Sequence, residues 1–247
     1  LLTNANHLLN KTDELYCVVQ RLMPGLICIT ETWLDNSVPD SLVSYSGYTA
    51  FRRDRSPGVG GGVICYVLNS YSSQSFEVHP KFANNHGFDF EIVWVMLRPN
   101  ILPRPIGCII VAVLYVPPWY NVERCNALKS YILMSIDYFR AKYSHPVFCI
   151  CGDFNTFNAD FLSNTLRFKQ LVKDPTRGTR ILDKCFVSCS ESYNDALIFP
   201  PLGRSDHNCV YVASIAKTCL NVGKRSFYKR SLTPSAIDAI ANDLVSF

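Results

Sequence analysis

The most constraining feature of this sequence is a series of short apolar runs, each bounded by glycine, proline, asparagine or a charged residue. Runs of this length, rich in valine, isoleucine and cysteine, predict β-strands. We expect strands at residues 26–30, 63–68, 90–97, 108–116, 147–151, 181–188 and 209–214. Polar and apolar residues alternate poorly within residues 90–97, which favours a sheet with both faces covered.

Two helices are predicted between these runs. Leu15 and Val19 follow Asn10 at helical spacing and indicate a first helix of about three turns, and a longer helix is expected between Asn121 and Tyr143. Successive strands with a few inserted helices predict two sheets packed together and covered by helices. They do not predict the strict alternation of a doubly wound fold.

The chain is long enough for one large domain or two small ones, and its length alone does not choose; we place one domain at residues 1–215. The 247 residues are 48% hydrophobic, and no stretch of about 18 uncharged apolar residues predicts a membrane span. The first residues lack an initiator methionine and a signal pattern, so we expect a chain cut from a longer protein. Residues 216–247 are predicted to be a basic linker followed by a helix from about Pro234. The basic segment from Lys217 to Arg230 is either solvated or a nucleic-acid contact.

The eleven cysteines are spaced irregularly and contain no C-x-x-C pair. Most of them lie in the strand-like runs, where a free thiol packs as a small apolar group. We therefore favour buried thiols over disulfides or a zinc site. Such thiols predict a reducing compartment, the nucleus and cytoplasm.

Polar residues of chemical interest gather where the predicted strands meet loops. They are Glu31, Tyr115, Asp153, Asn155, Asp183, Ser205, Asp206 and His207. Each alone has an ordinary explanation, such as a turn residue, a surface histidine or a core tyrosine. Together, carboxylates, a histidine, a tyrosine and asparagines supply what is needed to hold Mg²⁺ and to hydrolyse a phosphate ester.

The order of E-T-W, G-G-G-V, Y-V-P-P, G-D-F-N, L-D and S-D-H-N resembles the endonuclease/exonuclease/phosphatase superfamily, which includes DNase I and the apurinic/apyrimidinic endonucleases. The chain is most similar to the endonuclease domain of non-LTR retrotransposons of the jockey and chicken-repeat types. The similarity extends from about Asn4 to Val212. It implies a DNase I-like four-layer α/β sandwich, with two mostly antiparallel sheets flanked by helices.

The resemblance also implies a function. It predicts a Mg²⁺-dependent endonuclease, with Mn²⁺ as a substitute, that nicks one strand of double-stranded DNA. The nick has a 3′-hydroxyl and a 5′-phosphate and primes a reverse transcriptase domain in the same parent polypeptide. Alternatives left open are an abasic-site endonuclease, a phosphatase acting on phosphoinositides or sphingolipids, and an inactive fragment that only binds nucleic acid.

Residue roles follow from the same resemblance. Glu31 is the expected principal Mg²⁺ ligand, Asn4 helps to arrange the metal and the phosphate, and Asp206 lies beside both. Asp153 positions or deprotonates the attacking water. The identity of the general base stays open at this point.

The remaining positions of the resemblance concern the phosphate. Tyr115 and Asn155 are expected to hydrogen-bond the scissile phosphate, and Ser205 to add a hydroxyl contact. His207 is expected to donate a proton or a hydrogen bond to the developing charge, with Asp183 as its orienting carboxylate.

Three further expectations concern the surrounding loops. Arg52, Arg53 and Arg55 either contact DNA phosphates or belong to a solvated loop. The glycines at 58–62 lack the lysine of a P-loop and predict a tight hairpin before residues 63–68, and D-P-T-R at 174–177 predicts scaffold. Only three residues precede Asn4, and Asn6 stands where the superfamily carries a basic residue. We therefore expect a truncated first strand that leaves Asn4 loosely held.

Overall fold

The computed structural model describes residues 1–56, 58–76, 89–100 and 102–215 of the protein. The described residues up to Ile215 belong to one compact unit. The predicted linker and the helix from about Pro234 lie outside the described residues. Among the helices that the structure describes, none combines the length and the apolarity needed to cross a bilayer.

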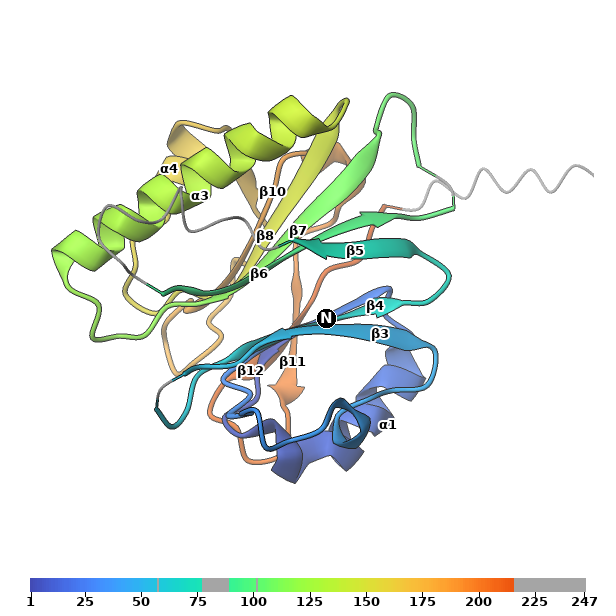
Figure 1. Ribbon diagram of the computed structural model, residues 1–247, viewed down its shortest axis with the longest axis vertical. Helices are drawn as coiled ribbons and strands as arrows, with labels where there is room; N and C mark the ends of the chain where they lie inside the picture. The colour runs from blue at the N-terminus through green and yellow to red at the C-terminus, as the bar shows by residue number, and fades with distance from the viewer. Residues whose placement is uncertain (57, 77–88, 101, 216–247) are drawn as a thin grey trace, which may run out of the picture. The chain divides into compact units, whose positions relative to one another are not determined.

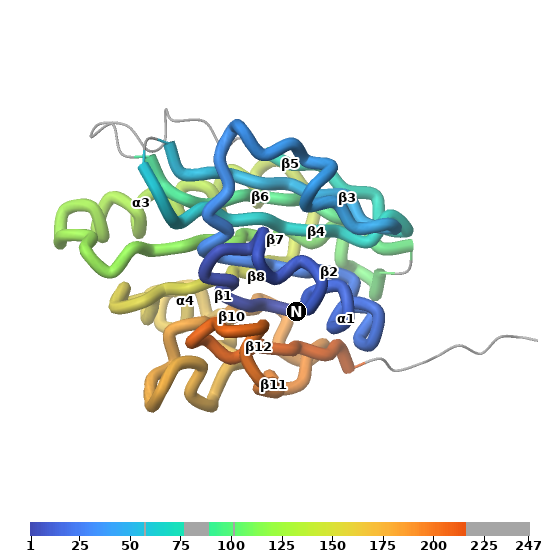
Figure 2. The backbone as a smooth tube through the Cα atoms, turned by 90° about the horizontal axis from the view of Figure 1, so that it is seen from below, coloured from blue at the N-terminus to red at the C-terminus, as the bar shows by residue number. Residues whose placement is uncertain are grey.

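The first sheet contains strands from both ends of this unit. Its six strands run in the order β11-β12-β1-β2-β4-β3. They are β1 (Leu2–Asn4), β2 (Leu26–Thr30), β3 (Tyr48–Arg53), β4 (Val63–Leu68), β11 (Leu197–Pro201) and β12 (Asn208–Tyr211). Figure 2 shows the start of the chain lying beside the late strand β12.

The second sheet is formed by the middle of the chain, in the order β5-β6-β7-β8-β10-β9. Its strands are β5 (Ser72–Phe76), β6 (Glu91–Arg98), β7 (Cys108–Tyr115), β8 (Pro146–Asp153), β9 (Lys169–Gln170) and β10 (Asp183–Val187). β7 and β8 pair in parallel, as β1 and β2 do, and the other pairs are antiparallel. The parallel pair β7–β8 needs a crossover connection, and α3, which lies between these strands in the sequence, supplies it.

Helices cover the outer face of each sheet (Figure 1). They are α1 (Thr12–Leu22), α3 (Val122–Lys142) and α4 (Asp160–Asn164), with short 3-10 helices η1 (Leu8–Lys11), η2 (Asp40–Leu42) and η3 (Ser190–Ser192). α3 begins where predicted, because the Asn121 side chain accepts a hydrogen bond from the Arg124 N–H and caps the helix. Three separate apolar cores fill the three spaces between the four layers. The predicted four-layer sandwich is confirmed.

The strands that the sequence analysis missed share one property. β3, β5, β9 and β11 are mostly half-buried or exposed; the first three contain polar residues, and β11 (L-I-F-P-P) contains two prolines. They lie at the sheet edges. Edge strands need no continuous apolar run, because one side of each is open to solvent.

The expectation of a loosely held Asn4 is wrong. β1 has only three residues, yet it pairs with β2 on one side and β12 on the other. The Asn4 side chain is 1% exposed. Pairing on both sides compensates for the short length.

The ten cysteines among the described residues are free thiols. Four of the buried ones, Cys28, Cys65, Cys151 and Cys185, pack in the core between the two sheets. The preference for apolar thiols over disulfides is confirmed for this part of the chain.

Candidate active site

The candidate site lies at one end of the core between the sheets, where apolar side chains give way to polar ones. Along β6, β7, β8 and β10, alternate residues face either the helices or the opposite sheet. Strand register places Tyr115 beside both Glu91 and Asp153, and Asp153 beside Asp183. These four side chains therefore form one polar row across the inner face of the second sheet.

The G-D-F-N motif fixes the centre of this row. A side chain at Gly152 would collide with the Leu114 carbonyl of β7, so only glycine permits this close pairing of the strands. Asn155 has a left-handed backbone (φ 45°), and its N–H donates to Asp153 Oδ1 at 2.9 Å. Its side-chain amide donates to the Val116 carbonyl at 2.9 Å, which ties the turn to the end of β7.

Asn4 connects the two sheets at this point. Its Nδ2 donates to Glu31 Oε1 and to Asp153 Oδ2, each at 2.9 Å, and its Oδ1 accepts from the Asn6 N–H at 3.0 Å. Two carboxylates from opposite sheets are thus held beside one amide group. Asn4 and Glu31, which the resemblance assigned to the metal, are brought together with Asp153.

Glu31 lies on a strained segment. Glu31 and Trp33 both have positive φ values, 50° and 55°, although neither is glycine. The backbone is held from both sides, by Glu31 O accepting from His7 N and by Trp33 N donating to Gly61 O. Trp33 Nε1 also donates to Glu31 Oε2 at 3.3 Å. Strain of this kind persists where the surroundings fix it and is concentrated at functional sites.

His207 and Asp183 form a buried pair next to Asp153. His207 Nδ1 lies 2.7 Å from Asp183 Oδ2, and His207 Nε2 lies 4.0 Å from Asp153 Oδ2. The imidazole is 2% exposed. The predicted orienting role of Asp183 therefore has the geometry it requires.

Thr176 of the D-P-T-R segment is the support for Asp183. Its buried hydroxyl accepts hydrogen bonds from the N–H groups of Leu182 and Asp183, each at 3.1 Å. Its carbonyl accepts from the N–H of Asn208, next to the histidine. Both members of the pair are thus fixed through one residue, as the scaffold interpretation of this segment predicted.

Two residues of the S-D-H-N motif have contacts of their own. Ser205 Oγ donates to the Asn4 carbonyl at 2.7 Å and accepts from the His207 N–H at 3.3 Å, so it connects the two halves of the site. The Asp206 side chain is half-exposed at the rim and pairs with Arg177 at 2.5 Å. The structure does not bring Asp206 into the buried group of carboxylates.

The electrostatics of the site follow from burial and crowding. Burial raises the pKa of Asp153 to about 7, and the charge of Asp183 acts in the same direction. Burial alone would lower the pKa of His207, but the hydrogen bond and the charge of Asp183 raise it above the ordinary value. Burial, with the nearby Glu31 carboxylate, raises the pKa of Tyr115, so its hydroxyl stays protonated.

The donor atoms present suit a metal ion. Asp153, Asp183 and His207 each offer one ligand atom, and these atoms lie within 4.8 Å of one another. Asp183 Oδ1 is buried and has no hydrogen-bond partner in the part of the chain that the structure describes. A buried carboxylate oxygen without a partner is costly, and a cation removes that cost.

Arg52 and Arg53, for which DNA contacts were predicted, form ion pairs with acidic residues of the chain. Arg52 pairs with Asp40 and Asp54, each at 3.2 Å, and its side chain is only 17% exposed. Arg53 pairs with Asp89 and remains partly exposed. Arg52 therefore holds a loop against β3, which corrects its assignment to a phosphate.

Glu91 and Arg55 form a second buried pair that the sequence analysis did not identify. Arg55 Nε donates to Glu91 Oε1 at 2.8 Å, and the Gly62 N–H donates to Glu91 Oε2 at 2.5 Å. The glycine segment wraps this pair, because a side chain at Gly61 would collide with both partners. β3 and β4 pair as an antiparallel hairpin, as predicted, but their connection spans residues 54–62, so the hairpin is not the tight one expected. The only signal in the sequence was a glutamate at the start of an apolar strand.

Comparisons with known proteins place this geometry in context. No family model and no curated protein sequence matches the chain. Solved structures match: the AP endonuclease LMAP from Leishmania major is 15% identical, with a TM-score of 0.61 and 84% of each chain covered. The 3′ phosphatase NExo from Neisseria, bound to a product DNA hairpin, is 14% identical, with a TM-score of 0.63 over 86% of this chain and 97% of that one.

The chain has the DNase I-like fold. The human Nocturnin catalytic domain also matches at 17% identity, with a TM-score of 0.56 over 85% of this chain and 91% of that chain. At such low identities the likeness concerns the fold. The activity of this DNase I-like sandwich is therefore argued below from its own side chains.

Proposed function

We propose that the chain is a metal-dependent phosphodiesterase, and specifically a Mg²⁺-dependent endonuclease that nicks one strand of double-stranded DNA. One observation carries the proposal: the Asn4 amide joins the Glu31 and Asp153 carboxylates beside the His207–Asp183 pair. The fold supports it, because the matching structures include AP endonucleases and a phosphatase bound to DNA.

Mg²⁺ is the ion that this donor set favours. It prefers carboxylate and amide oxygens over imidazole nitrogen, and His207 Nδ1 is already engaged with Asp183. Glu31 and Asp153 would hold it, together with Asp183 Oδ1, which has no hydrogen-bond partner among the described residues. When bound, a divalent cation neutralises charge on the phosphate oxygens and lowers the pKa of water.

The side chains supply the remaining chemistry. Asp153 lies next to Tyr115 and 4.0 Å from His207 Nε2, where its carboxylate is placed to accept the proton of the attacking water. His207, whose pKa the hydrogen bond and charge of Asp183 raise, donates to the charge that develops on the phosphate. Tyr115 is the strand neighbour of Asp153 and Asn155 donates its N–H to Asp153, so both lie beside this carboxylate and orient the phosphate by hydrogen bonds.

The test is incubation with supercoiled plasmid in the presence of Mg²⁺, with EDTA as the control. We expect open circles in Mg²⁺ only, and nicks that a DNA ligase reseals because they carry a 3′-hydroxyl and a 5′-phosphate. No nicking by a folded sample would contradict the proposal. A shift of DNA in a gel without nicking would identify a fragment that only binds nucleic acid.

The finer assignment, to a non-LTR retrotransposon, is supported by the order of the six sequence motifs. In that setting the 3′-hydroxyl primes a reverse transcriptase domain of the same polypeptide, in the nucleus or the cytoplasm. Extension of the purified nick by a reverse transcriptase, without prior end repair, tests the chemistry that this role requires.

An abasic-site endonuclease is the second candidate, because two of the matching structures are AP endonucleases. The two activities differ in substrate preference. Duplexes with and without a single abasic site, cut in parallel, distinguish them. Strong preference for the abasic duplex supports the second candidate. Release of inorganic phosphate from phosphoinositide head groups would instead identify a phosphatase.

A further inference from the structure

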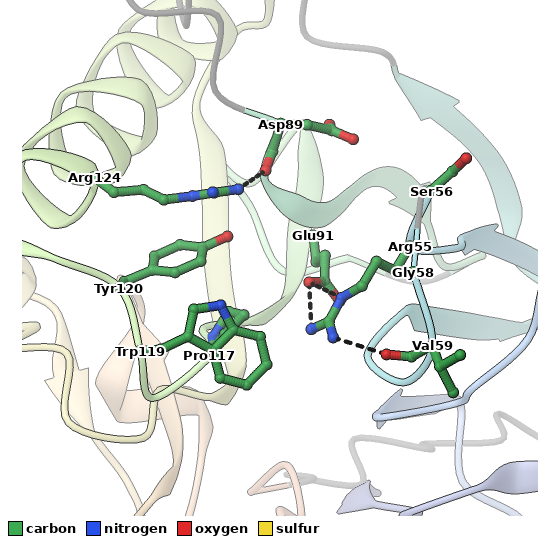
Figure 3. Close-up of a pocket in the computed structure, with 10 residues that line it drawn as sticks. All are labelled: Arg55, Ser56, Gly58, Val59, Asp89, Glu91, Pro117, Trp119, Tyr120 and Arg124. Atoms are coloured by element: carbon green, nitrogen blue, oxygen red, sulfur yellow. Dashed lines mark hydrogen bonds and ion pairs between the residues drawn. The ribbon is translucent and has the colours of Figure 1, made fainter.

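A cleft of about 480 Å³ opens beside the active site, on the side of Tyr115 away from His207. Figure 3 shows Trp119, Tyr120 and Arg124 along one side, and Arg55 with Val59 along the other. Glu91 lies between them. The volume falls within the range of about 300–1,000 Å³ that small-ligand sites occupy.

The cleft and the active site share a wall. Glu91 is the direct strand neighbour of Tyr115. The Arg55 guanidinium lies 5.6 Å from the centre of the Tyr115 ring and 5.2 Å from that of Trp119. Asp153 is two strands away from Glu91, about 10 Å across the sheet. A nucleotide close to the scissile phosphate therefore reaches the cleft.

The aromatic side of the cleft is built for stacking. Trp119 is 66% exposed, which is unusual for so large an apolar ring. It follows Pro117 and Pro118, whose rings restrict the backbone. The Tyr120 ring next to it lies 4.3 Å from the guanidinium of Arg124. Flat aromatic rings combined with guanidinium groups bind nucleobases without requiring a particular base.

Charge distinguishes a base from a phosphate as the occupant. The cleft contains two arginines, Arg55 and Arg124, and two acids, Glu91 and Asp89. Arg55 is bound to Glu91 through two nitrogens, Nε at 2.8 Å and the terminal nitrogen at 2.7 Å. The lining therefore has no formal excess of positive charge. A phosphate needs such an excess, whereas an uncharged base does not.

We propose that this cleft binds one unstacked nucleobase of the DNA strand being cut, with Trp119 as the stacking surface. The inference rests on the proposed DNA endonuclease function and adds a second subsite to it. A base in the cleft has left the duplex stack, so target sites that unstack easily are preferred.

The first experiment detects the base directly. Duplexes carry 2-aminopurine, a fluorescent base, at successive positions along one strand, and they are titrated with protein in EDTA so that they stay intact. We expect a fluorescence change at one position. Trp119→Ala should abolish it and Trp119→Phe should retain it. Tyr16→Ala is the matched control, because Tyr16 is an exposed aromatic residue (51%) of α1 outside the cleft.

The second experiment measures catalysis. Trp119→Ala should raise the KM for the duplex by about 5- to 150-fold, the range for loss of one base–aromatic stack, with kcat within about threefold of the wild type. Nick positions sequenced across a plasmid should lose base preference at the position that 2-aminopurine identified. Tyr16→Ala should change neither quantity.

The outcomes separate this inference from the proposed function. Nicking by the wild type, with Trp119→Ala equal to it in KM, in nick positions and in fluorescence, overturns the cleft assignment alone. Absence of nicking, together with a Trp119-dependent fluorescence change, overturns the endonuclease and supports the base-binding cleft.

Discussion

The polar row across the second sheet has a buried carboxylate at each end, Glu91 and Asp183, and the two differ in whether both of their oxygens have partners. At one end, the Glu91 carboxylate accepts hydrogen bonds from Arg55 Nε and from the Gly62 N–H, which both belong to the connection between β3 and β4. At the other end, Asp183 Oδ2 forms a hydrogen bond with His207 Nδ1, while Asp183 Oδ1 is buried and has no partner among the described residues. We call the Glu91 end of this row the finished end, because both carboxylate oxygens have partners. We call the Asp183 end the unfinished end, because one carboxylate oxygen has none among the described residues.

The loops beside the two ends differ in the same way. The segment that wraps Glu91 takes its positive φ values at Gly60, Gly61 and Gly62, where they cost little. The segment that presents Glu31 takes them at Glu31 and Trp33, where they cost on the order of 1–3 kcal/mol each. A carboxylate with a partner on each oxygen indicates a scaffold, whereas a buried carboxylate oxygen without a partner among the described residues, beside a strained backbone, indicates a site that awaits a ligand.

The largest expected effect on stability is at the finished end. Glu91→Ala leaves the Arg55 guanidinium, whose side chain is only 17% exposed, without its carboxylate, and we expect the free energy of unfolding to fall by about 3 kcal/mol in urea denaturation. The matched control is Asp195→Ala, which removes a pair with Lys169 that is about half exposed. That variant should lose about 0–1 kcal/mol. Equal losses in the two variants would contradict the scaffold role.

The next effect concerns activity, at the unfinished end. His207→Ala should slow nicking by about 10²- to 10³-fold, or about 3–4 kcal/mol, because it removes a donor to the charge of the transition state. Asp183→Asn should be similarly slow, and the double variant little slower than either, because the two residues act as one unit.

A histidine far from the site provides the control for that series. His145 is exposed and precedes β8 at the end opposite Asp153. His145→Asn should nick at the wild-type rate. Small, additive losses for His207→Ala and Asp183→Asn, with folding confirmed by circular dichroism, would remove both residues from the mechanism.

A smaller effect is the pH dependence of the metal-free protein. The folded-state pKa of Asp153, about 7, exceeds its unfolded value, so ionisation opposes folding as pH rises from about 4 to 7. His207 acts in the same direction, since its raised pKa gives stability that is lost as it deprotonates. We expect the free energy of unfolding to fall over this window, measured in EDTA, relative to Asp153→Asn.

Two comparisons check the source of that pH dependence. Asp137→Asn is the control, since Asp137 is 76% exposed on α3, and it should retain the full wild-type dependence. Addition of Mg²⁺ should reduce the loss, because the cation favours the ionised carboxylates. If the free energy of unfolding of the wild type depends on pH no more than that of Asp153→Asn, Asp153 is not held in a low-dielectric site.

The smallest expected effect is at Glu31. Glu31→Gln should weaken Mg²⁺ binding and reduce nicking about tenfold at limiting Mg²⁺, with part of the rate restored at higher Mg²⁺, since one ligand charge is lost. Asp153→Asn should not be restored in this way, because it also removes the proton acceptor. Identical Mg²⁺ titrations for the two variants would show that Glu31 and Asp153 have no separate roles.

Local sequence predicted the interior of the fold well. The strands β2, β4, β6, β7 and β8 were found because their residues are apolar on both faces. β5 (S-S-Q-S-F) was missed, because an edge strand with an exposed side has no such run. The motifs also identified Asn4, Glu31, Asp153, Asp183 and His207, which the structure brings to one end of the core.

By itself, the sequence determined which residues form the strand interiors and which chemical groups stand at the strand ends, because both depend on neighbours along the chain. Tertiary structure decided which of those groups meet. The contact between Asn4 and Asp153 joins residues 149 positions apart, and Arg55 finds Glu91 across 36 positions. It also placed Arg52 in a scaffold and Asp206 at the rim. Such contacts depend on strand register and on the packing of one sheet against the other, and no local pattern encodes either.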